Sequence, residues 1–184
     1  MLGLVLALLM QKVDPAAAAA PPPDPMGQYL ADLEKAGILT GDKEPATLER
    51  LKGQIAAAED ELVTGNAEIA SVTLFRVVES PRYAKFDYAP EYAIAELTLS
   101  RALIRAGGYK TAERYLLRVL GRGTKSPAFA PAYRGLGEVY EQQARTRDAT
   151  AAYLNYIKQA PAAPDRAIVM SRLRLLTTQL KVGQ

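Results

Sequence analysis

The residue types that most often carry out chemistry in proteins are absent from this chain or scattered along it. Its 184 residues include no Cys and no His, which excludes thiolate nucleophiles and removes the commonest general base and metal ligand. A catalytic centre would therefore rest on carboxylates, Lys, Ser or Tyr. The densest acidic cluster is Glu59-Asp60-Glu61. In a helix Glu59 and Glu61 point to different faces, so we interpret the cluster as a solvated surface.

Two glycine-rich stretches could be mistaken for phosphate-binding loops. Gly107-Gly108 and Gly121-Arg122-Gly123 lack the Lys-Ser/Thr pair and the preceding strand of such a loop, and we interpret both as helix ends. We therefore predict that the chain is not an enzyme. We expect no catalytic residues, no metal ion and no cofactor.

Charge and tyrosine content leave a second hypothesis open. Residues 24–80 carry 5 Lys/Arg and 11 Asp/Glu, whereas residues 81–184 carry 17 and 8. Ten tyrosines accompany these charges, and aromatic rings between arginines can stack on nucleic-acid bases. The alternative function is therefore a basic nucleic-acid-binding helical module in the cytoplasm. That alternative predicts that residues 1–20 are not cleaved.

The N-terminal residues are typical of export. Residues 2–10 are almost wholly apolar, too few for the roughly 20 residues of a membrane-spanning helix but suited to a signal peptide. Residues 16–20 are alanines, which suit cleavage by a signal peptidase. We predict a signal-peptide-like segment over residues 1–20, a periplasmic or cell-envelope location, and no transmembrane span in the mature chain. Since the chain has no Cys, a lipid anchor is not supported.

The remaining residues have helical spacing and no strand pattern. Residues 21–44 are predicted to form a Pro/Ala linker and a short helix, with the extended spacer running to Pro25. Apolar residues then recur at steps of three and four, interrupted by Gly, Asn and Pro. This spacing predicts three helical hairpins over residues 45–163 and a last helix over residues 164–184. The last helix has Val169, Leu173, Leu176 and Leu180 on one face. The apolar stripes of the first hairpin are Leu48, Leu51, Ile55, Ala58 and Leu62, then Ile69, Val72, Phe75 and Val78.

The third hairpin carries a motif of its own. Tyr133, Leu136-Gly137, Tyr140, Ala149, Tyr153 and Pro161 closely resemble the Trp, Leu-Gly, Tyr, Ala, Phe and Pro positions of the tetratricopeptide repeat, TPR. The second hairpin is similar but weaker, with Ala112 at the repeat alanine and Glu96 where the first aromatic belongs. In the first, Ala70 takes the alanine position. The resemblance implies an all-α fold, an α-α superhelix of about three hairpins, with residues 164–184 as a capping helix.

The resemblance also implies where a partner binds. In this family, partners usually lie in the concave groove formed by the first helix of each hairpin. The groove positions carried over to this chain are Ile94, Leu97, Arg101, Ile104, Arg105, Arg134, Glu138, Glu141 and Gln142. Their types suggest an apolar floor with an arginine rim for a peptide or helix of acidic character.

Export and repeats together define the leading hypothesis. We expect a non-catalytic protein-protein interaction scaffold of the bacterial cell envelope that assists assembly of a pilus, gliding, secretion or outer-membrane machine. A protein or peptide partner is expected in the groove, and no nucleic acid. The part of this hypothesis that names machines rests on analogy with the family.

Overall fold

The computed structural model describes residues 23–39, 44–122 and 127–182, and within these ranges the chain is helical and forms no strand. The predicted all-α class is thereby confirmed. Two short 3-10 turns, Ala84–Phe86 and Pro127–Phe129, lie in the connections before α4 and α6. The α-helices are α1 (Pro25–Lys35), α2 (Leu48–Thr64), α3 (Ala67–Val78), α4 (Pro90–Arg105), α5 (Tyr109–Gly121), α6 (Ala130–Gln142), α7 (Thr146–Gln159) and α8 (Arg166–Val182).

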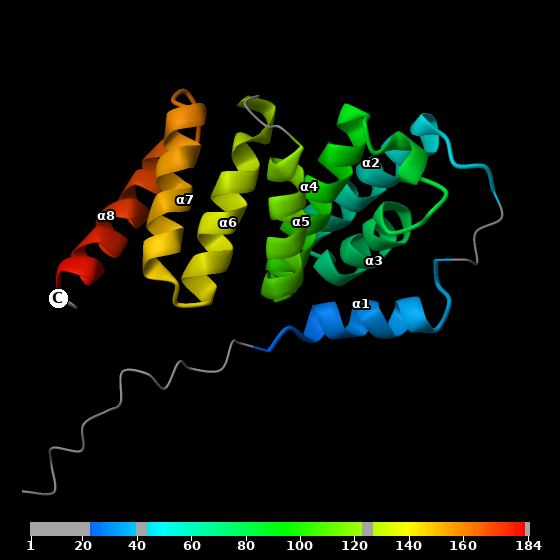
Figure 1. Cartoon of the computed structure of the whole chain (residues 1–184), viewed down its shortest axis with the longest axis horizontal. Helices are drawn as coiled ribbons and strands as arrows, with labels where there is room; N and C mark the ends of the chain where they lie inside the picture. The colour runs from blue at the N-terminus through cyan, green and yellow to red at the C-terminus, as the bar shows by residue number, and fades with distance from the viewer. Residues whose placement is uncertain (1–22, 40–43, 123–126, 183–184) are drawn as a thin grey trace, which may run out of the picture.

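The helices pack in chain order (Figure 1). The pairs α2–α3, α4–α5 and α6–α7 form three hairpins, and α8 packs on α7. Helix α4 also contacts α2 on one side and α6 on the other. The first helices of the hairpins, α2, α4 and α6, therefore form one layer, called the inner layer below.

The same turn closes each hairpin. Gly65 and Gly107 have positive φ angles of 91° and 79°, and Ala144 occupies the corresponding place with φ 56°. After each of them an amide donates to the carbonyl five residues earlier, at 2.8 Å, 2.7 Å and 2.8 Å for the three turns. This is the hydrogen bond that ends helices through a left-handed residue. The three hairpins therefore share one local geometry, although Ala144 adopts a conformation that favours glycine.

Small residues let the two helices of a hairpin approach closely. The repeat alanines Ala70, Ala112 and Ala149 are fully buried. A Cβ added at Gly137 would fall 2.3 Å from a ring carbon of buried Tyr153 on α7. Tyr140 is also buried. The structure thus places these residues where the sequence predicted close helix contact.

One detail of the first hairpin differs from the sequence-based expectation. Ile69 was expected on the buried stripe of its helix but is 54% exposed, and Ala70 and Leu74 are buried instead. The reason is that α3 packs against both α2 and α4, so the buried face is centred on Ala70, Leu74 and Val78, which keep a spacing of four residues, and not on Ile69. In the C-terminal helix, three of the four expected stripe residues are buried, namely Val169, Leu173 and Leu176, whereas Leu180 is partly exposed.

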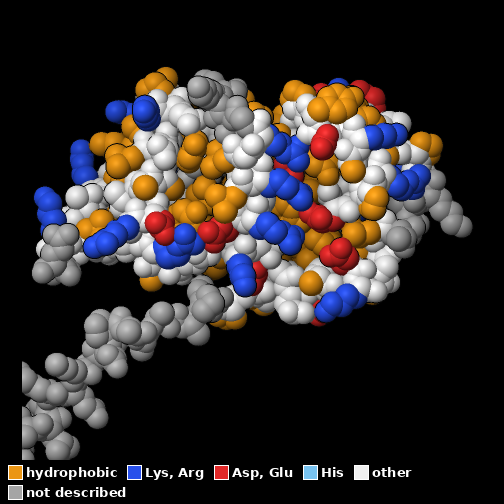
Figure 2. Space-filling view, viewed as in Figure 1, with side chains coloured by type: hydrophobic (Ala, Val, Ile, Leu, Met, Phe, Trp, Pro, Cys, Tyr) orange, Lys and Arg blue, Asp and Glu red, His pale blue; other side chains and the backbone are white. Residues whose placement is uncertain are grey.

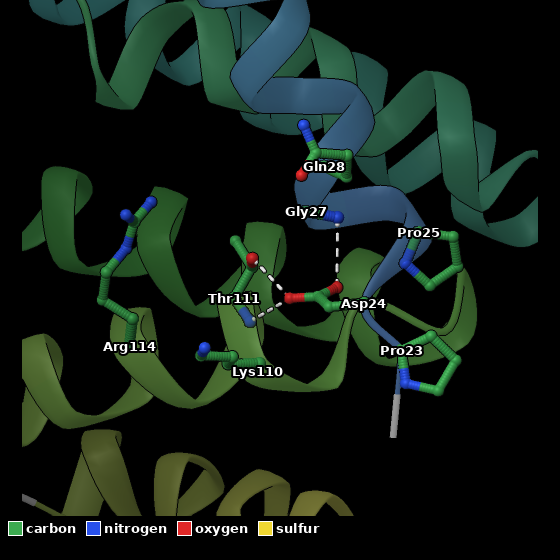
Figure 3. Close-up of a pocket in the computed structure, with 8 residues that line it drawn as sticks. All are labelled: Pro23, Asp24, Pro25, Gly27, Gln28, Lys110, Thr111 and Arg114. Atoms are coloured by element: carbon green, nitrogen blue, oxygen red, sulfur yellow. Dashed lines mark hydrogen bonds between the residues drawn. The ribbon is translucent and has the colours of Figure 1, made fainter. Parts of the chain in front are cut away.

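Helix α1 packs on the hairpins rather than projecting from them. It contacts α3 and α5, and its Met26 and Leu30 are buried. Figure 3 shows how its first turn is held. Asp24 Oδ1 accepts from the amide of Gly27 at 3.1 Å, while Oδ2 accepts from the amide and hydroxyl of Thr111 at 2.8 Å and 2.7 Å.

One carboxylate therefore caps two helices, α1 and α5, that lie far apart in the sequence. Asp24 and Pro25 belong to the folded part, and the expectation that the extended spacer runs to Pro25 is corrected. The signal-peptide-like segment, residues 1–20, lies outside the described residues. Within the described ranges, no helix has the length and apolar character needed to cross a membrane.

Candidate functional site

A hollow of about 540 Å³ opens on the inner layer between α4 and α6. We call it the α4–α6 hollow. Seven of the nine predicted groove residues line it, from Ile94 and Leu97 at one end of α4 to Arg105 at the other. Its full lining is Glu59, Ile94, Leu97, Thr98, Arg101, Ile104, Arg105, Leu116, Ala128, Pro131, Arg134, Gly135 and Glu138.

The floor of the α4–α6 hollow is apolar. Ile94 is 44% exposed, and Leu97 and Ile104 are partly buried against the core. These three side chains lie on α4, where the i, i+3 and i+10 spacing keeps them along one face of the helix. Below them Leu116 of α5 is buried. Water over this floor would be released when an apolar partner side chain covers it.

Gly135 shapes the floor and was not among the predicted residues. A Cβ at this position would lie 3.1 Å from both terminal methyl carbons of Leu116 and 3.6 Å from Ile104. Because Gly135 has no side chain, Leu116 and Ile104 can pack against α6 at this point and line the hollow. Its position within α6, two residues before the motif glycine, is the only sequence signal for it.

The rim charges are compensated by neighbours in the fold. Arg101 pairs with Glu59 of α2 at 3.4 Å, and Arg105 donates to the Leu62 carbonyl at 2.8 Å. That carbonyl lies in the last turn of α2, where a cation interacts favourably with the helix dipole.

On the other wall, Arg134 pairs with Glu138 at 3.1 Å and with Asp165 at 2.9 Å. Arg101 and Arg134 of the expected arginine rim are therefore each paired with a carboxylate. Figure 2 shows the same pattern on the face it displays, where basic side chains run over the middle of the molecule with acidic ones beside them.

The last two predicted residues lie outside the hollow. Glu141 accepts from Arg172 of α8 at 2.9 Å, and Gln142 is exposed at the end of α6. Glu141 is one helical turn beyond Glu138 and so lies along the same face of α6 as the hollow wall. The ion pair of Glu141 with Arg172 therefore joins this face of α6 to α8.

No family model matches the chain, and no curated protein matches it. The site is therefore interpreted from its own geometry. Among the described residues, no group of three or more acidic side chains is arranged to hold a metal ion.

A second polar cluster lies between α4 and α5 but is enclosed. Glu96 is fully buried and accepts from Arg118 Nε at 2.5 Å and from Arg122 at 3.0 Å. Arg118 also pairs with Glu79 at 3.0 Å. Burial raises the pKa of Glu96, and the two guanidinium groups oppose that rise.

This cluster explains how a carboxylate can be buried at position 96, where the resemblance noted in the sequence predicts an aromatic residue. Arg118 of α5 and Arg122, which directly follows α5, pair with Glu96 and so make its burial tolerable. Because Glu96 has no exposed surface, a partner or substrate cannot reach it without unfolding the hairpin. We assign the cluster to fold stability.

The third candidate is the open depression beside Asp24. It is lined by the first turn of α1 and by Lys110, Thr111 and Arg114 of α5 (Figure 3). Its central carboxylate is occupied by the two helix caps described above. The depression therefore serves to dock α1, and the α4–α6 hollow remains the candidate functional site.

Proposed function

We propose that the chain is a TPR-type scaffold that binds a protein partner in the α4–α6 hollow and performs no catalysis. The observation that carries the proposal is the hollow itself, an accessible apolar floor with polar rims on the inner layer of stacked hairpins. Surfaces of this kind bind the apolar face of a peptide or helix. The repeated turn geometry at Gly65, Gly107 and Ala144 supports the repeat interpretation.

The compensated charges favour a protein over a nucleic acid. Arg101 and Arg134 in the hollow each have a carboxylate within 4.0 Å. Binding to a phosphate backbone draws on unpaired basic side chains, whereas protein interfaces combine an apolar centre with a polar rim of both signs. The hollow corresponds to the second pattern.

Site-specific photo-crosslinking in intact cells tests this function. A photoreactive amino acid would replace Leu97 on the floor, and in a matched control Leu154, which is 55% exposed on α7 outside the inner layer. We expect one defined protein adduct from position 97 and none from position 154. Equal adducts from both positions, or none from position 97, would contradict the function.

We further propose that the scaffold acts in the bacterial cell envelope and assists assembly of a larger machine there. The support is the apolar run and alanine block of residues 1–20. Mass spectrometry of the native protein is expected to find a mature N-terminus after one of residues 16–20. Recovery of the chain with Met1 intact in the soluble cytosol would overturn this location.

A further inference from the structure

Helix α8 has an apolar side that the core does not use. Val169, Leu173 and Leu176 face the hairpins and are buried, but Ile168 and Leu175 are each 61% exposed. A helix that only covers the end of a repeat stack needs a polar outer face. These two exposed side chains therefore require an explanation beyond capping.

Their place in the fold follows from the ion pairs on either side. Ile168 and Leu175 lie four residues before and three residues after Arg172, so the three share one face of α8. Arg172 donates to Glu141 of α6 at 2.9 Å. Asp165, just before α8, pairs with Arg134 of α6 at 2.9 Å. The exposed apolar pair thus borders the wall of α6 that begins in the hollow.

The wall between the two apolar areas carries balanced charge. Arg134, Glu138 and Glu141 follow one another along one face of α6, with Asp165 and Arg172 opposite them. Each arginine of this band is within 4.0 Å of a carboxylate. A partner crossing the band meets both signs of charge and gains little from a net charge of its own.

We propose that the binding surface continues from the α4–α6 hollow across this band to Ile168 and Leu175, and that it takes an amphipathic helix with two apolar clusters. This inference rests on the proposed function and specifies its partner. Helices α4 and α6 are in contact, which implies about 8–10 Å between their axes. Helix α8 is joined to α6 by the Arg172–Glu141 ion pair, so we take the two apolar areas to be roughly 20 Å apart. In a helix with a rise of 1.5 Å per residue, the two clusters are then separated by about 13 residues.

The expected partner segment has a defined chemistry. One cluster matches Ile94 and Leu97, which lie one turn apart on α4, and the other matches Ile168 and Leu175, which lie two turns apart on α8. The residues between the clusters are polar and include both Glu/Asp and Lys/Arg, which can meet Arg134, Arg172 and their carboxylate partners. An acidic peptide without a second apolar cluster fits only the hollow.

A displayed library of random 20-residue peptides, selected on the full chain, tests the inference without a known partner. Affinities of the selected peptides would be measured by fluorescence anisotropy. The variants are Ile94→Glu in the hollow, the double variant Ile168→Glu/Leu175→Glu on α8, and the control Leu117→Glu/Leu154→Glu on α5 and α7. The control residues are 48% and 55% exposed, which matches the α8 pair closely.

We expect selected peptides with two apolar clusters, at least tenfold weaker binding to both test variants, and a change below twofold for the control. If Ile94→Glu weakens binding and the α8 variant does not, the extension to α8 is wrong and the proposed function stands. If neither variant weakens binding, or no peptide is selected, both are wrong. Peptides with a single cluster, or equal loss in the control, also overturn the extension.

Circular dichroism would verify that each variant is folded. Should the α8 glutamates disturb the helix, Ile168→Ala/Leu175→Ala removes the same apolar surface and is expected to weaken binding at least threefold. Unchanged binding of the alanine variant would likewise overturn the extension.

Discussion

Replacing Gly137 by Ala should destabilise the protein, although alanine is the better helix former. The added Cβ would lie 2.3–2.6 Å from three ring carbons of Tyr153. Tyr153 is fully buried, so the ring cannot move aside without displacing the core. Overpacking of this kind costs about 1–3 kcal/mol and sometimes more, while the gain in helix propensity is at most about 1 kcal/mol. Since contacts as short as 2.3 Å place the cost in the upper part of that range, we expect a net loss of about 1–2 kcal/mol.

Gly53→Ala is the matched control. Gly53 lies inside α2 and an added Cβ meets nothing within 4 Å, so only the propensity gain of about 1 kcal/mol remains. Urea unfolding followed by circular dichroism would measure both free energies. A Gly137→Ala variant as stable as the wild type or more stable would refute the close contact of α6 with α7.

Four further outcomes follow from the structure. Asp24→Ala removes a cap from both α1 and α5 and should cost about 1–2 kcal/mol, with faster amide hydrogen exchange in α1; Asp32→Ala, in the exposed Asp32–Lys35 pair of α1, should change exchange little. Glu96→Ala breaks a buried ion pair and should cost about 3–5 kcal/mol, whereas Glu59→Ala breaks an exposed one worth under about 1 kcal/mol; equal losses in urea unfolding would contradict the assignment. Ala144→Gly should raise the free energy of unfolding by about 0.5–1 kcal/mol because φ is 56° there, and a loss would argue against that turn. Burial raises the pKa of Tyr92 and Tyr156 to about 12, so the neutral phenols favour the folded state and stability should fall as the pH rises from about 10 to about 12; absorbance at 295 nm should show these tyrosines ionising late or together with loss of helix, and full ionisation near pH 10 in folded protein would contradict their burial.

The helices and their turns could be predicted from the sequence because those signals are local. Gly65 ends α2 and Pro90 begins α4, as expected for glycine after a helix and proline in its first turn. The contact of Gly137 with the second helix of its hairpin was also predictable, since the TPR motif relates positions within 40 residues. These features depend on neighbours along the chain or within one hairpin.

The charged residues could not be placed in the same way. From the sequence, Glu96 is only a departure from the repeat pattern, whereas in the structure it is buried and paired with Arg118 of α5 and with Arg122 just after α5. Arg118 is itself half-buried in that ion pair. From the sequence, Asp24 is part of a linker. In the structure its carboxylate accepts a hydrogen bond from Thr111, which is 87 residues away. Each depends on a contact between elements that spacing alone does not reveal.

The α8 side of the surface was hidden for a related reason. Ile168 and Leu175 belong to an amphipathic helix whose buried stripe, Val169, Leu173 and Leu176, was predicted and is found. A single helical period assigns one apolar face to the core. The second apolar face, with Ile168 and Leu175, can be recognised only from the structure, because the ion pair of Arg172 with Glu141 fixes the orientation of α8.

The central claim is that the α4–α6 hollow binds a protein partner, and one dissociation constant tests it most directly. The partner identified by crosslinking would be purified and its affinity measured for Ile94→Glu and for Leu154→Glu. Both residues are surface-exposed, but only Ile94 lies in the hollow. We predict at least tenfold weaker binding for Ile94→Glu, about 1.4 kcal/mol, and wild-type affinity for Leu154→Glu. Wild-type affinity for Ile94→Glu together with weakened binding for Leu154→Glu would contradict the claim and place the interface on the outer helices.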